Sequence, residues 1–379
     1  MMSAGEVSGD IAGAHLAAAL LDKNPEARIF GVGGSRMTAA GVTILCDTNR
    51  LGSVGITEAI YPVFILARVF SKIRRCVKLQ RPDAAVLIGN DVFNLLLARW
   101  LKWKGIRTIS YFPPQVWLWR SLARPIARSF NCILTSFPEE QAVYERAGRN
   151  ATYVGHYLCD HLVPPSPNAK AASRAHFGIS PGATVVGLLP GSRIHEVAPL
   201  TPVLLDAALD LSRKQSIAFV LPVAEPCYRD YIEEQIIKRG LSTRVLLCDD
   251  SHEAMRVSDL LLMASGTASL EAALLAVPMM ILYPVSSVTF LAVKMLRRFG
   301  LIDSLTIGLP NLILGKRVVP ELRQNGLTPR QLASLAGSLL QDRQRQSEMS
   351  EELKKVRTLL GEGPALEKAA SIVLEHVEN

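Results

Sequence analysis

The chain has 379 residues, of which 49% are hydrophobic and 20% are charged. This length suits about two domains, and the composition predicts a large buried core and excludes disorder for most of the chain. The 42 Lys and Arg residues outnumber the 34 Asp and Glu residues. That excess favours anionic partners such as nucleotide diphosphates, acidic lipids or nucleic acids, although ordinary surface charge explains it as well.

The six cysteines are scattered and include no Cys-x-x-Cys pair. We therefore expect neither a zinc site nor a disulfide framework, but reduced core cysteines as in cytosolic proteins. No basic region precedes an apolar one at the N-terminus, which argues against a signal peptide. No uncharged apolar run reaches the roughly 18 residues of a spanning helix, so any membrane contact is expected to be peripheral.

In the first half of the chain, short apolar runs alternate with helical patterns, which is typical of a doubly wound parallel sheet. Helices are predicted at residues 11–21 and 92–103. The turn at residues 3–6 should follow a buried first strand, yet only two methionines precede it. A start codon placed too late or a degraded sheet would explain this apparent truncation. Further strands are predicted at residues 27–32, 84–88, 108–111, 132–135 and 152–154.

The Pro-rich passage at residues 162–169 is predicted to be a linker, because proline interrupts regular structure. The alternation then restarts, and two such repeats predict an α/β protein with two Rossmann-like, doubly wound domains facing a cleft, the GT-B arrangement. Two-domain binding proteins and epimerases share this outline. We expect domains at 1–162 and 170–345, and C-terminal helices at 346–379 that pack back on the first domain or on a partner subunit. Strands of the second domain are predicted at residues 185–189, 218–223, 244–247, 260–263 and 279–283.

The segment Ala-Gly-Glu-Val-Ser-Gly-Asp ends at Asp10 and precedes the first predicted helix. Its glycines, Gly9 among them, let the backbone approach a ligand. Because Glu6 and Asp10 oppose anion binding at a helix start, recognition of sugar hydroxyls suits this segment better than binding of phosphate. Capping of the helix by Ser8 or Asp10 explains the pattern equally well. A second glycine turn at residues 31–34 would line the same cleft.

A turn with the composition of a phosphate site follows the strand predicted at residues 185–189. At the carboxyl end of this strand, the chain brings together backbone amides, a hydroxyl and a permanently charged guanidinium group, contributed by Gly191, Ser192 and Arg193. Glu196 follows one helical turn later. A capped turn with a surface arginine is the alternative. The coincidence of the three residue types favours a diphosphate site, of the kind that a transferase lacking a metal needs to stabilise its leaving group.

A second such turn ends the strand predicted at residues 260–263. Ser265, Gly266 and Thr267 open a helix whose N-terminus favours phosphate, and Glu271 on that helix is suited to accept hydrogen bonds from ribose hydroxyls. Ser and Thr also cap helices routinely, yet two such turns in one domain favour a nucleotide site. In a later loop-rich stretch, where a plain turn is the simpler interpretation, the candidate contacts are Asn311 and Glu321.

The stretch from Tyr61 to Lys78 combines a broad apolar face with five basic residues. This pattern fits a helix lying in an anionic membrane surface, and a buried helix with solvated basic ends fits equally well. Tryptophans among basic residues farther along would extend such a surface. The bases of a nucleic acid can also stack on aromatic side chains. The sequence contains no recognised nucleic-acid-binding module, however, so a nucleic acid is not expected as a partner. The residues concerned are Trp100, Trp103, Trp117 and Trp119 with Lys102, Lys104, Arg107, Arg120, Arg124 and Arg128.

Eight segments, in order and with matching spacing from Ser3 to about Pro329, together resemble the lipid-A-disaccharide synthases. They read AGEVSGD, GVGGSRM, GSVGITEAI, FPPQVWLWR, YVGHYLCD, LLPGSRIHEV, ASGTASLEAAL and LPNLILGKRVVPEL. The resemblance implies an inverting GT-B glycosyltransferase of family 19. Such enzymes join UDP-2,3-diacylglucosamine to 2,3-diacylglucosamine 1-phosphate, giving a β-1,6 disaccharide and UDP. They use no metal or other cofactor, work at the cytoplasmic face of the inner membrane and can dimerise by exchanging C-terminal elements.

The likeness also assigns residues. It implies an acceptor side lined by Glu6, Ser8 and Asp10, and a UDP site formed by Arg193, Ser265, Gly266, Thr267, Glu271 and Asn311.

One segment departs from the family. The usual stretch is Gly-Ile-Asp-Ala-Pro-Asp-Phe-Asn, whose second Asp is a candidate catalytic base. Here it reads Gly89-Asn90-Asp91-Val92-Phe93-Asn94, shorter by two residues, with Val92 at the position of that Asp. Asp91 is adjacent, but neighbouring side chains at a helix start point in different directions.

The favoured mechanism is a direct sugar transfer. A carboxylate, Asp91 first and Asp10 or Glu6 second, is predicted to deprotonate the acceptor 6-hydroxyl, while Arg193 and the helix at Thr267 stabilise the departing UDP. Two alternatives remain open. One is another GT-B enzyme that acts on a UDP-sugar, such as a related glycosyltransferase or an epimerase. The other is an inactive homologue that binds a UDP-sugar or a lipid.

Overall fold

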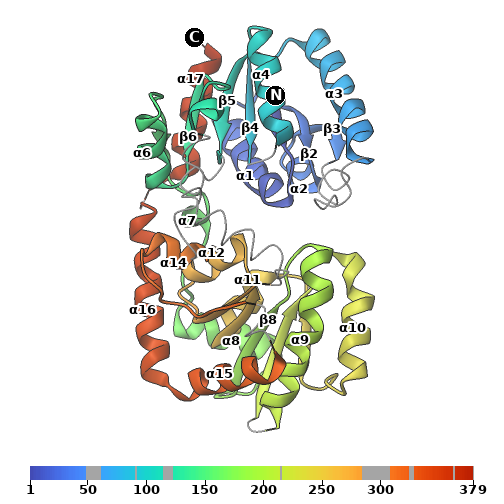
Figure 1. Ribbon diagram of the computed structural model, residues 1–379, viewed down its shortest axis with the longest axis vertical. Coiled ribbons are helices and arrows are strands. Elements are labelled where there is room, and N and C mark those ends of the chain that lie inside the picture. The colour runs from blue at the N-terminus through green and yellow to red at the C-terminus, as the bar shows by residue number, and fades with distance from the viewer. Residues whose placement is uncertain are drawn as a thin grey trace. The chain divides into compact units, whose positions relative to one another are not determined.

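The structure is a computed structural model that describes residues 1–47, 61–89, 92–113, 123–213, 216–283, 308–323, 328–361 and 363–378. Its chain forms two compact units (Figure 1). The first unit comprises Met1–His161 and Leu360–Asn379, and the second comprises Leu162–Leu359. The doubly wound α/β architecture predicted from the sequence is confirmed, because each unit is built on one sheet whose paired strands are all parallel.

The first unit has a 7-stranded sheet in the order β3-β2-β1-β4-β5-β6-β7. Its strands are β1 (Met2–Ala4), β2 (Phe30–Gly33), β3 (Thr43–Asp47), β4 (Ala84–Ile88), β5 (Arg107–Tyr111), β6 (Cys132–Thr135) and β7 (Thr152–Tyr153). Its helices are α1 (Val7–Lys23), α2 (Ser35–Ala39), α3 (Tyr61–Gln80), α4 (Val92–Trp103), α5 (Ala123–Ala127), α6 (Pro138–Arg146), α7 (Leu158–His161) and α17 (Ala365–Glu378).

Strand β1 is present and central, although it is only 3 residues long. All three residues are buried, and the strand pairs with β2 on one side and with β4 on the other. The scarcity of residues ahead of the first glycine turn thus produces a short strand rather than a gap in the sheet.

The second unit has a 6-stranded sheet in the order β10-β9-β8-β11-β12-β13. Its strands are β8 (Thr184–Leu189), β9 (Ile217–Pro222), β10 (Val245–Cys248), β11 (Leu260–Ala264), β12 (Met279–Tyr283) and β13 (Glu321–Arg323). Its α-helices are α8 (Pro167–His176), α9 (Ile194–Ser212), α10 (Arg229–Lys238), α11 (Ser251–Val257), α12 (Thr267–Leu274), α14 (Leu309–Ile313), α15 (Pro329–Gln341) and α16 (Arg343–Leu359).

The boundaries between the units differ from those expected at two places. The Pro-rich passage contains the boundary at Leu162, but its last residues already form the start of α8, because Pro167 occupies a first-turn position that tolerates proline. The C-terminal segment expected at 346–379 is split. Helix α16 stays with the second unit, where Met349, Leu353 and Val356 bury one face of the helix against neighbours that include α12. The return to the first unit begins at Leu360, and α17 packs against α1.

Candidate functional site

Four of the segments singled out in the sequence are the turns after β1, β4, β8 and β11. They lie at the points where the strand order of each sheet reverses. In the first sheet β1 and β4 are neighbours, and in the second sheet β8 and β11 are neighbours, with the chain winding outward from each pair. Open parallel sheets bind ligands beyond the carboxyl ends of the strands at such switch points. The turns after β1 and β4, and those after β8 and β11, are therefore the candidate site of each unit.

Asp10 links the glycine turn that follows β1 to the glycine turn that follows β2. One oxygen of its carboxylate accepts hydrogen bonds from the backbone N–H of Gly34 at 2.6 Å and of Met37 at 3.2 Å, and the other accepts from Arg36 at 3.2 Å. The side chain is buried, with 5% of its surface exposed. It thus satisfies the free amides at the start of α2. Asp10 therefore holds the turn before α2 in place through three backbone amides.

Asn94 and Gly9 build the floor of the same switch point. The Asn94 amide donates to the carbonyls of Ser3 at 3.2 Å and Ile88 at 2.9 Å, and its oxygen accepts from the Ser3 hydroxyl at 2.7 Å. These bonds join the carboxyl ends of β1 and β4. A Cβ at Gly9 would lie 3.3 Å from the Cβ of Ala4, so glycine lets α1 pack closely on the sheet. Both residues therefore stabilise the switch point of the first sheet.

Glu6 and Ser8, the other two residues predicted for the acceptor side, lie at the start of α1. Glu6 is the half-buried residue preceding α1, and Ser8 is half-buried in its first turn. Asn90 and Asp91 lie outside the described residues. On either side of them, β4 ends at Ile88 and α4 begins at Val92, whose side chain is 73% exposed.

The turn after β8 is closed by Glu196. Its carboxylate reaches back and accepts a hydrogen bond at 3.1 Å from the N–H of Ser192, the residue before the N-cap of α9. Gly191 has a positive φ of 108°, and a side chain there would collide with Glu196. Arg193 lies with Nη1 3.9 Å from Glu196 Oε1 and is 44% exposed. Glu196 therefore shapes the turn, and Arg193 extends from it toward solvent.

The turn after β11 leaves open space at the start of α12. Gly266 has φ 154° and ψ −166°, a conformation reserved for glycine, and no atom of the described residues lies within 4 Å of the position of a Cβ. The Ser265 N–H donates a hydrogen bond to the carbonyl of Leu282 at 3.1 Å. Thr267 begins a helix of 8 residues whose positive end is the feature of this turn that suits an anion.

Glu271, one turn farther along α12, is paired with a residue that the sequence did not single out. Its Oε2 lies 3.0 Å from Nε2 of His252 on α11. The hydrogen bond to Glu271 raises the pKa of His252 above its ordinary value, against the opposing effect of burial. The two residues are 19 positions apart in the sequence, and no local pattern indicates the pair.

Asn311 of α14 and Glu321 of β13 are buried and hydrogen-bonded to each other. The Asn311 amide donates to the Val319 carbonyl at 2.9 Å and to Glu321 Oε1 at 2.8 Å, and its oxygen accepts from the N–H groups of Val318 and Val319. Both polar atoms of Asn311 are therefore engaged within the protein. The sequence placed these two residues in the nucleotide site, and the structure shows the bonds that hold them within the second unit.

The apolar face of the basic helix α3 is part of the core in its described portion. Val69, Ile73 and Val77 are buried at successive turns, and the five basic residues of the helix are exposed. The interpretation as a buried helix with solvated basic residues therefore fits residues 67–80, and the side chains of 61–66 lie outside the description. Among the helices in the described ranges, none has the length and apolarity needed to cross a bilayer.

The expected tryptophan-rich basic surface is only partly present. Trp100 packs edge-on against Phe70 of α3, with ring centroids 5.3 Å apart, whereas Trp103 is 74% exposed beside Lys104. The amine of Lys102 is bound to the carbonyls of Arg128 and Phe130, so its role is structural. Trp117, Trp119 and Arg120 lie outside the described residues.

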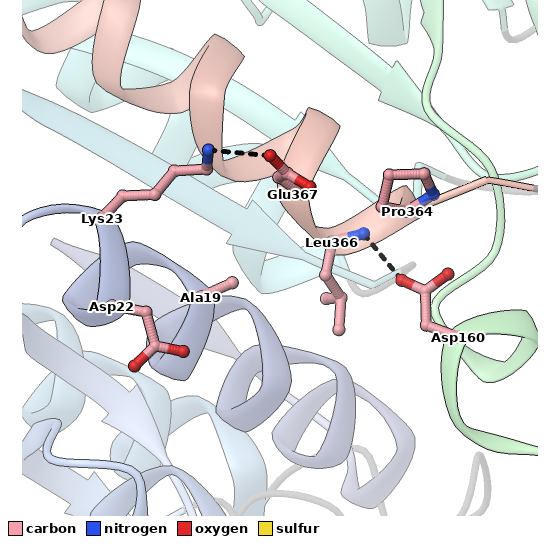
Figure 2. Close-up of a pocket in the computed structure, with 7 residues that line it drawn as sticks. All are labelled: Ala19, Asp22, Lys23, Asp160, Pro364, Leu366 and Glu367. Atoms are coloured by element: carbon pink, nitrogen blue, oxygen red, sulfur yellow. Dashed lines mark hydrogen bonds and ion pairs between the residues drawn. The ribbon is translucent and has the colours of Figure 1, made fainter.

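The segment YVGHYLCD anchors the C-terminal helix. Figure 2 shows Asp160 beside the start of α17, where its carboxylate accepts hydrogen bonds from the N–H groups of Ala365 at 3.2 Å and Leu366 at 3.0 Å. Lys23 of α1 pairs with Glu367 at 3.4 Å across the same solvent-open cavity of about 550 Å³. None of the predicted site residues lines this cavity, so the segment's conspicuous sequence reflects docking of α17.

Comparisons with known proteins agree with the geometry. The family model described as lipid-A-disaccharide synthetase matches residues 1–375. The lipid-A-disaccharide synthase of Geobacter sulfurreducens is 38% identical over 377 residues, covering 99% of this chain and 96% of that protein. The crystal structure of Acinetobacter baumannii MurG has a TM-score of 0.57 at 13% identity, covering 99% of both chains. That of the Neisseria meningitidis UDP-GlcNAc 2-epimerase bound to UDP-GlcNAc has a TM-score of 0.56 at 14% identity, covering 100% of this chain and 99% of the other.

Proposed function

Since the chain belongs to the lipid-A-disaccharide synthase family, we propose that it joins UDP-2,3-diacylglucosamine to 2,3-diacylglucosamine 1-phosphate. The products are the β-1,6-linked disaccharide 1-phosphate and UDP. The observation that carries this proposal is the match to the family over nearly the whole chain, together with the position of its glycine turns at the switch point of each sheet.

The second unit is proposed to hold the donor. The side chain of Arg193 is 44% exposed at the turn after β8, and its planar guanidinium group can pair with two oxygens of a diphosphate. The open start of α12 at Gly266 and Thr267 supplies backbone amides to the same group. Glu271 would accept hydrogen bonds from the ribose. Asn311 and Glu321 would support this site indirectly, by holding α14 to β13.

The first unit is proposed to bind the acceptor and supply the base. Asp91 takes the proton of the acceptor 6-hydroxyl as that oxygen forms its bond to the anomeric carbon of the donor. The bond from the anomeric carbon to the diphosphate breaks with inversion, and UDP leaves with its charge stabilised by Arg193 and α12. Glu6 is the second candidate for the base. Asp10, bound to three backbone amides, keeps the turn in place.

Two other activities have a specific motivation. The likeness in fold to a UDP-GlcNAc 2-epimerase favours a related reaction on a UDP-sugar as an alternative. The altered segment from Gly89 to Asn94 favours, more weakly, a protein that binds the donor without turning it over.

The test is an assay of UDP release by the purified protein with both lipid substrates, followed by mass spectrometry of the lipid. Disaccharide and UDP are expected only when donor and acceptor are both present. An altered sugar formed from the donor alone would point to the epimerase-type alternative. Tight binding of UDP without formation of any product would support the alternative of a protein that binds the donor but does not turn it over.

We also propose that α4 contacts an anionic membrane. Val92, Leu96 and Trp103 are 73%, 55% and 74% exposed and share one face of the helix at intervals of four and seven residues. Helix α3, joined to α4 through Phe70 and Trp100, presents its five basic residues to solvent. An apolar stripe beside a basic helix suits a bilayer that contains acidic lipids, and it replaces the apolar face of α3 as the expected contact.

Sedimentation with vesicles of phosphatidylethanolamine and phosphatidylglycerol tests this contact. The double substitution Leu96→Ser with Trp103→Ser is expected to weaken binding by about tenfold or more, because burial of one large apolar side chain contributes about 1.5–3 kcal/mol. Ile237→Ser is the matched control, since Ile237 is 68% exposed on α10 of the second unit. Equal binding by the double variant and the control, with unchanged melting temperatures, would contradict the assignment to α4.

A further inference from the structure

His252 occupies a defined position beside the proposed donor site, yet none of the steps above uses it. It lies in the first turn of α11, where the carboxylate of Asp250 accepts hydrogen bonds from the N–H groups of His252 at 2.8 Å and Glu253 at 3.4 Å. This cap fixes the backbone from which the ring extends. The ring reaches Glu271 of α12 at 3.0 Å. The side chain of His252 is 34% exposed and that of Glu271 is 14% exposed, so the pair is partly shielded from water.

We propose that His252 is a positioning residue for the UDP group of the donor, which orients Glu271 toward the ribose and cancels its charge beside the diphosphate. This inference rests on the proposed UDP site. It adds a residue from a third element, α11, to the turns after β8 and β11.

The orienting effect follows from the geometry of the hydrogen bond. A glutamate side chain loses about 1.5–2 kcal/mol of conformational entropy when it is fixed, and a partner that holds it in the unbound protein removes part of that cost from ligand binding. His252 engages Oε2 of Glu271. Within the described part of the chain, Oε1 has no hydrogen-bond partner. It is therefore the oxygen available to a ribose hydroxyl.

The effect on charge follows from the location of Glu271. This carboxylate is carried by α12, the helix whose N-terminus is proposed to receive the diphosphate. An uncompensated negative charge there would repel that group. A protonated His252 makes the pair neutral overall, so the positive end of α12 and Arg193 act on the diphosphate without this opposing charge.

The surroundings of His252 favour its protonated form. The hydrogen bond to Glu271 is the main reason that its pKa is raised, burial acts in the opposite direction, and the charges of Glu271 and Asp250 outweigh that of Arg256. Arg256 is itself paired with Glu253 at 2.9 Å. The cations that α8 brings to α11 are engaged at its far end, where Lys170 and Arg174 bind Asp259 and nearby carbonyls.

The pH dependence has a definite sign. With its pKa raised above the ordinary value of about 6.5, His252 is charged at lower pH and loses its proton as the pH rises through the raised value. Affinity for UDP is therefore expected to fall over that range. Neutral histidine still donates an N–H to Glu271, so recognition of the ribose should persist. Because the terminal phosphate of UDP itself titrates near pH 6, the informative quantity is the ratio of affinities between wild type and a variant.

The experiment is titration of the full-length protein with UDP and with uridine between pH 6 and pH 9, by calorimetry and NMR. His252→Gln keeps a neutral donor near Glu271. We expect it to bind UDP about 3- to 10-fold more weakly than wild type at pH 6, a ratio that falls toward one at high pH, and to bind uridine as wild type does. His252→Ala should weaken uridine binding as well. His176→Gln, at an exposed position on α8, is the control and should match wild type throughout.

Two results would overturn this role. One is a UDP affinity ratio between wild type and His252→Gln that stays constant with pH. The other is an equal loss of UDP and uridine binding in His252→Gln, which would indicate a purely structural residue. Failure of the wild-type protein to bind UDP at any pH would instead remove the proposed donor site, and this role with it.

Discussion

Replacing Asp91 with Asn is expected to lower kcat by about 10²–10⁴-fold, the usual contribution of a general base. The amide has nearly the same size as the carboxylate but cannot accept the proton of the attacking 6-hydroxyl. UDP affinity should stay within about twofold of wild type, because the proposed donor site belongs to the other unit and its contacts do not include Asp91. Steady-state UDP release gives kcat, and calorimetry gives the affinity for UDP.

Two further substitutions make the Asp91 result specific. Asp10→Asn should lower the melting temperature and reduce activity only through the fraction folded, because its carboxylate holds three backbone amides. Glu6→Gln tests the other candidate in the same assay. Near-normal turnover by Asp91→Asn together with a large loss in Glu6→Gln would transfer the role of base to Glu6. The shortened segment around Asp91 would then be a change that the family mechanism tolerates.

The strands that the sequence predicted include every central strand except the short β1, which was expected to be truncated, and also the edge strands β7 and β10. The central strands are nearly continuous apolar runs, which a parallel sheet covered by helices requires. The predictions at residues 84–88, 132–135 and 279–283 coincide with β4, β6 and β12. The two missed strands, β3 and β13, are at the edges of their sheets. Strand β3 is half-exposed and β13 has 3 residues, so neither has the composition that marks a central strand.

The positions of the candidate turns in the two sheets could be predicted, but the direction of their polar side chains could not. Glycines after predicted strands locate the turns at the switch points, because the carboxyl ends of parallel strands share one edge. A buried carboxylate or amide, however, has the same local sequence whether it meets a ligand or the protein's own backbone. Asp10 and Asn311 were placed in the site from the sequence, and both are bound to backbone amides, those of Asn311 from Val318 and Val319 and one of those of Asp10 from Gly34.

The same limit applies to pairs formed between elements. Nothing near His252 in the sequence indicates that it pairs with Glu271. In the same way, nothing near residue 346 indicates which unit packs against α16, the helix that contains it. An amphipathic pattern predicts that α16 has a buried face, but its partner is decided by surfaces such as α12 that fold from remote segments. Information of this kind is in the whole chain and becomes visible only in three dimensions.

Replacing Arg193 with Ala is expected to lower kcat/KM for the donor by about 10²–10³-fold, the range found when one group that stabilises a developing charge is removed. The loss should appear in both KM and kcat, since the diphosphate carries charge in the bound donor and gains more as UDP departs. The melting temperature should change little, because the side chain of Arg193 is 44% exposed and exposed ion pairs contribute little to stability. Donor kinetics at saturating acceptor and calorimetry with UDP measure the two effects.

Arg193→Lys and Arg213→Ala separate specific recognition from general charge. Lysine retains the positive charge but not the planar fork, so Arg193→Lys should recover part of the affinity for UDP and less of kcat. Arg213 follows the far end of the same helix α9, is 69% exposed and pairs with Asp210. Its removal subtracts the same charge from the unit and should leave the kinetics unchanged. If Arg193→Ala behaved like Arg213→Ala, the turn after β8 would contribute nothing to the departure of UDP, and α12 alone would have to stabilise the leaving group.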